Sequence, residues 1–295
     1  MTERLAELDA RVGGIRELGA VVNAMRGIAA ARVQQAGTQL AAVDRYAAII
    51  MAAIGQALLL APGRRDQPAG EGRSDTRAGR PHLRTAIVLF CAEQGFAGAF
   101  SQRVLDFTGD DLARCELFLI GTRGNTALLE RGIVASWTGA MPAHSQGIPR
   151  LADRIVDALY VRIASGEIDR LDAVFGRWEP GTGATVQRQH LFPVDMTAFP
   201  RPADLNPPLL NLAPAILLQD LTANYMHAQL CEAALHGFAA ENQARMEAMA
   251  AAHNQIGREL SSLQAMQRMV RQEEITAEII ELAAGETASR SGFGQ

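Results

Sequence analysis

The chain has 295 residues and a mass of 31.6 kDa, which is enough to bury at least one sizeable core. Its 28 basic residues nearly balance 32 acidic ones, and the net charge of −4 argues against a nucleic-acid binder that depends on bulk positive charge. All of the basic residues are arginine. The absence of lysine excludes a Walker-type phosphate loop and any Schiff-base chemistry on lysine.

The three cysteines, Cys91, Cys115 and Cys231, stand far apart in the chain. An odd and dispersed set is typical of a reducing compartment and argues against a disulfide framework or a zinc site. The start, Met1-Thr2-Glu3, lacks the basic and then apolar order of a signal peptide, and no uninterrupted apolar run reaches about 20 residues. We therefore expect a cytosolic protein with no direct membrane span, which would join a membrane complex through partners.

Residues 1–60 predict one continuous helix, because apolar or small residues recur about every 3.5 positions and no proline occurs before Pro62. A spacing below 3.6 keeps one seam buried only if two helices supercoil around each other. A helix roughly 80 Å long favours a coiled-coil strand over the alternative, a helix lying on its own domain. The expected seam is Leu5, Leu8, Val12, Ile15, Leu18, Val22, Met25, Ala29, Val33, Ala36, Leu40, Val43, Ala47, Ile50 and Ile54.

The next two segments differ sharply in composition. Residues 61–82 are rich in proline, glycine and arginine and predict a flexible linker. Residues 83–195 alternate between strand and helix signals, which predicts a Rossmann-like α/β domain with a mainly parallel sheet covered by helices. Strands are expected at 85–90, 117–120, 133–137, 173–178 and 184–192, and helices at 101–112, 126–130 and 151–164.

Residues 196–214 are expected to form an extended connection, because prolines recur through this stretch. Residues 215–285 predict a second long helix, followed by a frayed tail over 286–295. Its expected seam is Leu235, Phe238, Asn242, Met246, Met249, Ala252, Ile256, Leu260, Leu263, Met266, Val270, Glu273, Ala277, Ile280 and Ala284. One chain thus supplies both strands, so we predict an α/β fold whose termini form a long antiparallel two-helix coiled coil, with the α/β domain inserted between them.

Motifs for catalysis are not found. Gly95-Phe96-Ala97-Gly98 follows a strand, but its GxxG spacing is not that of a dinucleotide-binding GxGxxG loop, so a tight turn is favoured. The chain has no GxSxG elbow, and its six histidines show no metal-ligand spacing. We predict no catalytic, cofactor-binding or metal-binding residues.

Three stretches carry a resemblance. Ala24-Met25 with Ala29-Ala30 lies in the first helix, Glu241 with Ala244-Arg245-Met246 and Ala248-Met249 lies in the last, and Arg271-Gln272, Ile275-Thr276 and Glu278-Ile279 lie near its end. In these motifs and in its order of helix, α/β domain and helix, the chain resembles the gamma subunit of F-type ATP synthases over essentially its whole length. Gly27 stands where methionine is common and Arg32 where lysine is common, departures that suggest a divergent branch such as the alternate ATPases of some bacteria.

The resemblance implies a non-catalytic rotor that couples ion flow through a membrane ring to conformational change in a catalytic hexamer. Its partners would be the alpha, beta and epsilon subunits and the membrane c-ring, and it would need no cofactor. It would be a peripheral subunit at the cytoplasmic face of the bacterial inner membrane. A catch region that contacts the beta subunits carries over as Arg271, Gln272, Thr276 and Glu278. The rotor-helix contacts carry over as Met25, Arg32, Glu241, Arg245, Met246 and Met249.

Two other functions stay open from the residues alone. One is an α/β enzyme that dimerises through its helical arms, and the other is a coiled-coil scaffold with a ligand-sensing domain. The enzyme would need titratable side chains clustered at the carboxyl edge of the sheet, which the sequence does not indicate. The scaffold would form a homodimer, whereas a rotor would be present once per complex.

Overall fold

The structure is a computed structural model in which residues 2–60, 84–199 and 210–292 are described. The expected linker at 61–82 lies outside the described residues, as does most of the expected connection at 196–214. Internal contacts divide the chain into two units. We call residues 1–28 with 246–295 the helical-pair unit and residues 29–245 the α/β unit, and describe each by itself.

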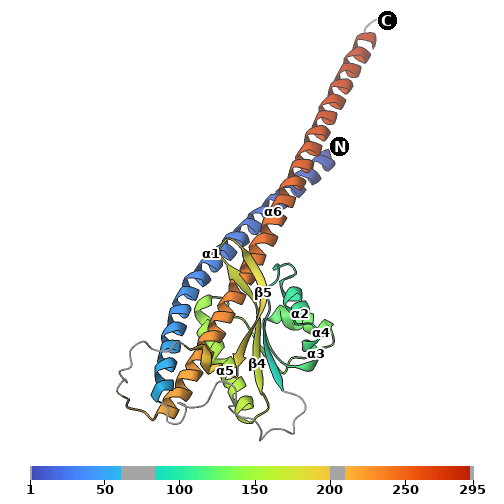
Figure 1. The fold of residues 1–295 in the computed structure, drawn as a ribbon. Helices are drawn as coiled ribbons and strands as arrows, with labels where there is room; N and C mark the ends of the chain where they lie inside the picture. Colours follow the sequence, from blue (N-terminus) through green and yellow to red (C-terminus); the bar gives the residue numbers. More distant parts are fainter. Residues whose placement is uncertain (1, 61–83, 200–209, 293–295) are drawn as a thin grey trace. The chain divides into compact units, whose positions relative to one another are not determined.

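Two long helices dominate the chain (Figure 1). Helix α1 spans Thr2–Leu60, and helix α6 spans Pro214–Gly292. Proline suits the first position of α6, where its missing N–H would have no partner within the helix. Helix α6 continues beyond residue 285, where the sequence predicts its end, so the stretch expected to fray is helical as far as Gly292.

In the helical-pair unit, α1 and α6 run antiparallel along each other. The side chain of Gln267 hydrogen-bonds Asp9, Arg11 Nη2 lies 3.5 Å from Glu259 Oε1, and Gly19 faces Ile256. Later positions along α1 therefore contact earlier positions along α6, as antiparallel helices require. Apolar side chains along the seam are less than a tenth exposed: Val12, Val22, Met249, Leu263 and Val270. The predicted antiparallel coiled coil between the two ends of one chain is confirmed.

The seam differs from the prediction at five positions, of which Ile280 and Ala284 are exposed where α6 extends past α1. Leu18 is 53% exposed, and its neighbour Gly19 is buried in its place. On α6, Met266 and Glu273 are exposed, and the partly buried positions are the following residues, Gln267 and Glu274. A Cβ at position 19 would lie 3.3 Å from Ile256 Cγ2, so glycine at this position makes room for the isoleucine side chain of the second helix.

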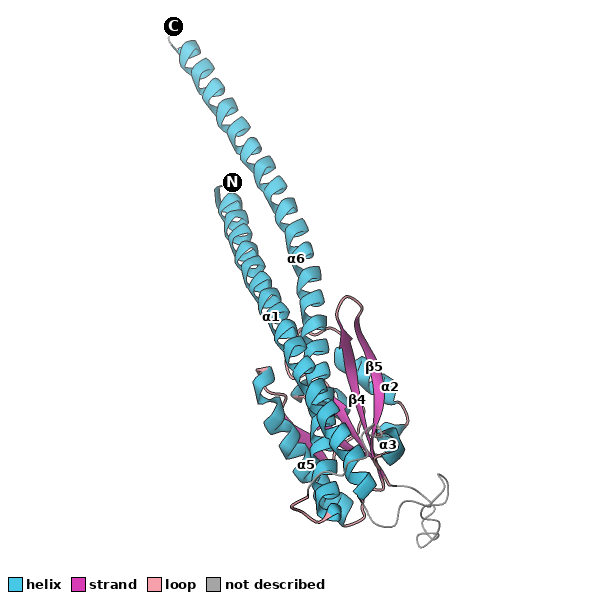
Figure 2. Ribbon diagram, turned by 60° about the vertical axis from the view of Figure 1, so that its left-hand side comes forward, coloured by secondary structure: helices cyan, strands magenta, loops and turns pink. Residues whose placement is uncertain are grey.

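Helix α6 extends past the N-terminal end of α1 (Figures 1 and 2). Its large apolar side chains there have no partner helix in this unit, and each is at least half exposed: Ile275, Ile279, Ile280 and Leu282. A single unpaired helix therefore ends the helical-pair unit.

In the α/β unit, five strands form one sheet in the order β3-β2-β1-β4-β5. Strands β1 (Thr85–Phe90), β2 (Glu116–Ile120), β3 (Trp137–Gly139) and β4 (Arg170–Glu179) run parallel to one another. Strand β5 (Gly183–Phe192) pairs antiparallel with β4 as a hairpin at the edge. The expected mainly parallel sheet is confirmed.

Helices cover both faces of this sheet. Alternate residues of β1 point to opposite sides: Val88 and Phe90 pack in the core shared with α1, α5 (Ile148–Ala164) and α6, and Ile87 and Leu89 pack against α2 (Phe100–Thr108) and α4 (Thr122–Glu130). Because both faces are covered, the central strands are continuous apolar runs rather than alternating ones.

Several predicted boundaries are wrong. The third strand is not at 133–137 but at Trp137–Gly139, because the chain first turns at Gly132, whose φ of 71° favours glycine. The helix expected at 101–112 is interrupted by Gly109, φ 56°, and resumes as α3 (Asp111–Arg114). The expected extended segment after 195 begins with a short 3₁₀ helix at Met196–Ala198, which Asp195 caps.

By length and composition alone, α1 is long and apolar enough to cross a membrane. One face of the same helix carries buried side chains in the α/β unit, among them Ala36, Ile50 and Ile54. That pattern is also shown by the core helix of a soluble domain, so the absence of a membrane span stays a prediction.

Candidate functional site

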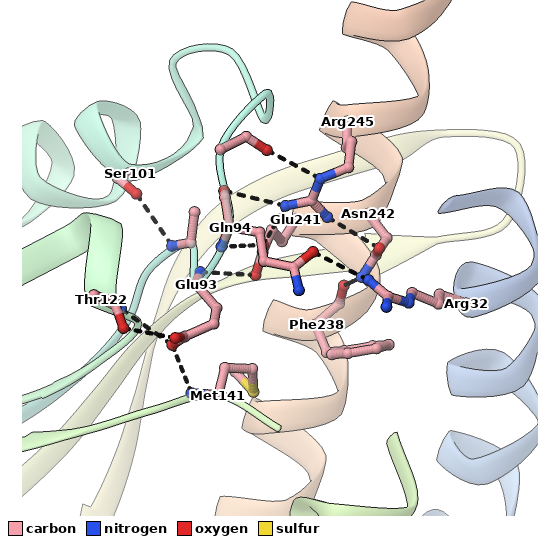
Figure 3. A network of polar contacts seen from close by, with 12 residues as sticks. Arg32, Glu93, Gln94, Ser101, Thr122, Met141, Phe238, Glu241, Asn242 and Arg245 are labelled. Atoms are coloured by element: carbon pink, nitrogen blue, oxygen red, sulfur yellow. Dashed lines mark hydrogen bonds and ion pairs between the residues drawn. The ribbon is translucent and has the colours of Figure 1, made fainter. Parts of the chain in front are cut away.

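The most extensive polar network among the described residues lies where the loop after β1 meets α6, within the α/β unit (Figure 3). We call the contacts between residues 93–95 and residues 241–245 the junction. The loop begins at the carboxyl end of β1, and it includes Phe96, the one described non-glycine residue with a positive φ, 62°. The junction therefore binds a loop whose backbone includes a left-handed conformation, unlike that of a helix or a strand.

Glu241 accepts hydrogen bonds from the loop backbone. The amide of Glu93 donates to its Oε2 over 3.2 Å, and the amide of Gln94 donates to its Oε1 over 3.1 Å. The residue is only 3% exposed, so these two N–H groups and its ion-pair partner replace the water that a carboxylate needs.

Arg245 lies one helical turn further on and completes the junction. Its Nη2 donates both to Glu241 and to the carbonyl of Gln94, 3.1 Å away, and its Nε donates to the carbonyl of Gly95 over 3.1 Å. Its Nη1 donates to Asn242 over 3.0 Å. Arg245 is 4% exposed, and its planar fork suits several acceptors at fixed angles.

Glu93 extends the network to two more strand ends. Its carboxylate accepts from the hydroxyl and the amide of Thr122, at 2.6 and 3.1 Å, and from the amide of Met141 over 2.9 Å. Thr122 begins α4 directly after β2, and Met141 follows β3. One side chain thus ties together the segments that leave the carboxyl ends of three neighbouring strands.

The junction does not have the chemistry of an active site. The nearest thiol, Cys91, has its pKa raised to about 12 by burial and by the charge of Glu241, so it is not a nucleophile at neutral pH. Glu241 and Arg245 neutralise each other, and all the acceptors of Arg245 are groups of this chain. Among the described residues, no group of His, Cys, Asp and Glu has a geometry that could hold a metal ion.

A second buried carboxylate lies on the sheet. Asp172 of β4 has a fully buried side chain that bonds Arg188 and His190 of β5, with 2.8 Å between Asp172 Oδ1 and His190 Nδ1. Burial alone would raise the pKa of Asp172, but the hydrogen bonds from His190, Arg170 and Arg188, with the charge of Arg188, together lower it. This cluster fastens the β4–β5 hairpin and presents no group to a cavity.

The α/β unit also contains an apolar pocket of about 570 Å³ between the ends of α1, α5 and α6. Leu58, Tyr160 and Met226 are among its lining residues, and Asp220 is the carboxylate beside it. Nothing in this lining resembles a set of catalytic groups.

The predicted contact residues lie in different environments. Arg271, Gln272, Thr276 and Glu278 are all exposed on α6 near its unpaired end. Of the predicted rotor-helix contacts in the helical-pair unit, Met25 and Met246 are partly exposed, and Met249 is buried.

The other three rotor-helix residues lie in the α/β unit, where Glu241 and Arg245 are buried and Arg32 is partly exposed. Glu241 and Arg245 form the junction, and Arg32 donates to Gln94 Oε1 over 3.3 Å. Sequence reasoning missed Glu93 and Gln94. A signal was available for Glu93, which is the first charged residue after the buried run of β1, at the strand end where polar side chains of parallel sheets gather.

A family model described as ATP synthase matches residues 4–288. A curated relative from Parafrankia sp., named ATP synthase gamma chain, is 26% identical over 310 residues, covering 99% of this chain and 100% of the relative. One of the same name from Streptomyces avermitilis is 24% identical and covers 94% of this chain and 93% of the relative.

Solved structures show the same fold at low identity. A chain of the Euglena gracilis mitochondrial ATP synthase, from a structure with OSCP, F1 and the c-ring, is 13% identical with a TM-score of 0.65, covering 100% of this chain and 97% of that one. A chain from the central stalk and c-ring of the Tetrahymena thermophila enzyme is 14% identical with a TM-score of 0.53, covering 79% and 99%.

Proposed function

The chain belongs to the ATP synthase gamma family, and from that premise we propose that it is the central-stalk rotor of an F-type ATP synthase. In this role it couples ion flow through a membrane ring to conformational change in a catalytic alpha/beta hexamer. Gamma chains are non-catalytic stalk subunits, so the chemistry of ATP is carried out by other subunits.

The observation that carries this proposal is the antiparallel pairing of the two ends of one chain. Arg11 with Glu259 and Asp9 with Gln267 pair within a single molecule, so the shaft needs no second copy. Two supercoiled helices resist bending and twisting more than one. The exposed faces of such a shaft differ around its axis, and each face can favour a different conformation of a surrounding subunit.

We assign the partners accordingly. The alpha and beta subunits surround the helical-pair unit, and the epsilon subunit and the c-ring contact the α/β unit. The complex lies at the cytoplasmic face of the bacterial inner membrane, where this subunit is peripheral. It uses no cofactor and binds no nucleic acid.

The catch region is proposed at Arg271, Gln272, Thr276 and Glu278 of α6. Their exposure supports a contact with beta-subunit loops, because charged and amide groups are available there to a partner. Met25 and Met246, which are partly exposed, are proposed to contact the surrounding ring through flexible apolar side chains. The buried residues Met249, Glu241 and Arg245 are proposed to serve the rotor through contacts inside the chain, and the partly exposed Arg32 through its hydrogen bond to Gln94.

Co-expression with the alpha and beta subunits of an F-type ATP synthase from the same organism tests the function. The expected product is an ATP-hydrolysing complex that contains one copy of this chain with three of each partner. Recovery of this chain as a free homodimer, with no alpha or beta subunit attached, would contradict the rotor and support a scaffold.

A further inference from the structure

Helix α6 lies on the sheet through an apolar face that combines large residues, such as Leu235 and Phe238, with several small ones. A Cβ added at Gly237 would lie 3.1 Å from Cβ of Phe90, and one added at Gly176 would lie 2.8 Å from Cβ of Ala240. Ala233 and Ala234 on the same helix are completely buried. Such contacts bring the helix close to the sheet, but apolar attraction is non-directional and opposes sliding or turning only through the shapes of the side chains.

The junction supplies a concentrated set of directional contacts to α6, beside the side-chain hydrogen bond from Gln189 of β5 to Gln229 of α6. Glu241 accepts from two successive backbone amides of the loop, and Arg245 donates to the next two carbonyls. Four hydrogen bonds from two side chains, one turn apart, recognise backbone atoms of three consecutive residues. Hydrogen bonds weaken steeply when distance or angle changes, so this set fixes one rotation and one height of α6 against the loop.

We infer that Glu241 and Arg245 are positioning residues that transmit torque between α6 and the sheet of the α/β unit. The inference rests on the proposed rotor function. When α6 is twisted, non-directional apolar packing would allow a slight rotation of the helix on the sheet before the shapes of the side chains resisted it. The hydrogen bonds of the junction instead transmit the torque to the backbone of residues 93–95. The hydrogen bonds of Glu93 then transmit it to the segments that follow β2 and β3.

This inference differs from a role of the two residues in contacting the catalytic subunits. Their side chains are 4 and 5% exposed, so they have little surface to offer a partner. It also differs from a role as a simple ion pair, because the backbone bonds depend on which of the two residues is the carboxylate.

Two variants separate these roles. Exchanging the charges, with Glu241→Arg and Arg245→Glu, keeps an opposite pair one turn apart but places a guanidinium against N–H donors and a carboxylate against carbonyl oxygens. Glu241→Gln with Arg245→Met removes the charges and keeps the bulk, so that no unpaired charge is left in the interior. The control is the exposed pair Asp110 and Arg114, also four residues apart, changed to Asn and Gln.

The first measurement is amide hydrogen exchange at Glu93 and Gln94 in the assembled complex. We expect exchange at both amides to speed up by about tenfold or more in each junction variant and to stay unchanged in the control. The second is the ratio of ATP-driven ion pumping to ATP hydrolysis in membrane vesicles that hold the complete synthase. This ratio should fall severalfold in both junction variants, whereas a loss of folding would lower assembly and leave the ratio of the assembled fraction unchanged.

The outcomes are distinct. The torque role would be overturned if the charge-swapped variant kept the wild-type ratio of pumping to hydrolysis. It would also be overturned if amide hydrogen exchange sped up in the junction variants while that ratio stayed unchanged. In both cases the rotor function would still stand. Failure of the wild-type chain to assemble with alpha and beta subunits would overturn the rotor function and this inference with it.

Discussion

Gly19 of α1 faces Ile256 of α6 so closely that a Cβ added to Gly19 would lie 3.3 Å from Ile256 Cγ2. Glycine is unfavourable in the middle of a helix, and its presence here is explained by the approach of the second helix. The neighbouring leucine at position 18 is exposed, so the close approach decides which face of α1 is buried.

We expect Gly19→Val to destabilise the helical pair by about 1–3 kcal/mol, because the added methyl groups force the two helices apart. Gly27→Ala is the control. No atom lies within 4 Å of a Cβ at Gly27, so this change should stabilise the helix by about 0.5–1 kcal/mol. Urea unfolding followed by circular dichroism measures both, and equal effects of the two substitutions would argue against close pairing at Gly19.

The exposed end of α6 provides a second prediction. Arg271→Ala combined with Gln272→Ala should lower ATP-driven pumping and the yield of assembled complex without lowering the thermal stability of the free chain, because both side chains are exposed. The matched control is Arg258→Ala with Gln255→Ala, an exposed pair on the same helix. If the control lowered pumping as much, the catch assignment at 271 and 272 would be wrong.

Asp172 makes the α/β unit sensitive to acid. Its pKa is lowered in the folded state, so its contribution is present above the unfolded value of 3.8 and is lost as pH falls through the folded value. Asp172→Asn should cost about 1–3 kcal/mol at pH 7, because buried hydrogen bonds to a carboxylate are lost, whereas the partly exposed Arg188 keeps its ion pair with Asp111. The difference from wild type, measured by urea unfolding at pH 7, 4 and 3, should shrink below pH 4. A difference that does not change with pH would contradict this account, and Asp110→Asn, on an exposed side chain, is the control.

Gly124 in α4 packs against Cys91 at the end of β1. A Cβ there would collide with Cβ of Cys91 and lie 2.9 Å from its Sγ. Gly124→Ala should therefore destabilise the α/β unit by about 1–3 kcal/mol, as judged by its melting temperature. Gly257→Ala, in a helix position with no neighbour within 4 Å, should raise the stability slightly. A tolerated Gly124→Ala would mean that α4 does not approach β1 so closely.

The long periodic elements were predictable from the sequence, and the close contacts were not. A spacing of about 3.5 residues over many turns admits few structures other than paired helices, and runs such as 85–90 lie between clear turn signals. The third strand was misplaced because Ile133, Val134 and Trp137 suit a strand by composition, but the turn at Gly132 delays pairing until Trp137. Such a choice depends on tertiary contacts that a local pattern does not contain.

The junction shows the same limit. The motif around Glu241 and Arg245 was recognised, and its residues were expected to serve as rotor-helix contacts. Which atoms they bind depends on a loop about 150 positions away in the sequence. The sequence does not indicate that the carboxylate of Glu241 binds the backbone amides of Glu93 and Gln94, because every residue except proline has such an amide, whatever its side chain.

The most direct test of the rotor is to watch this chain turn inside its complex. A small bead attached to Asp110→Cys, in a chain whose Cys115 is changed to serine, reports the motion of the α/β unit while the alpha and beta subunits are fixed to a surface. The account predicts that ATP drives continuous rotation of the bead in one direction. A complex that hydrolyses ATP while the bead stays still, with attachment verified, would contradict it.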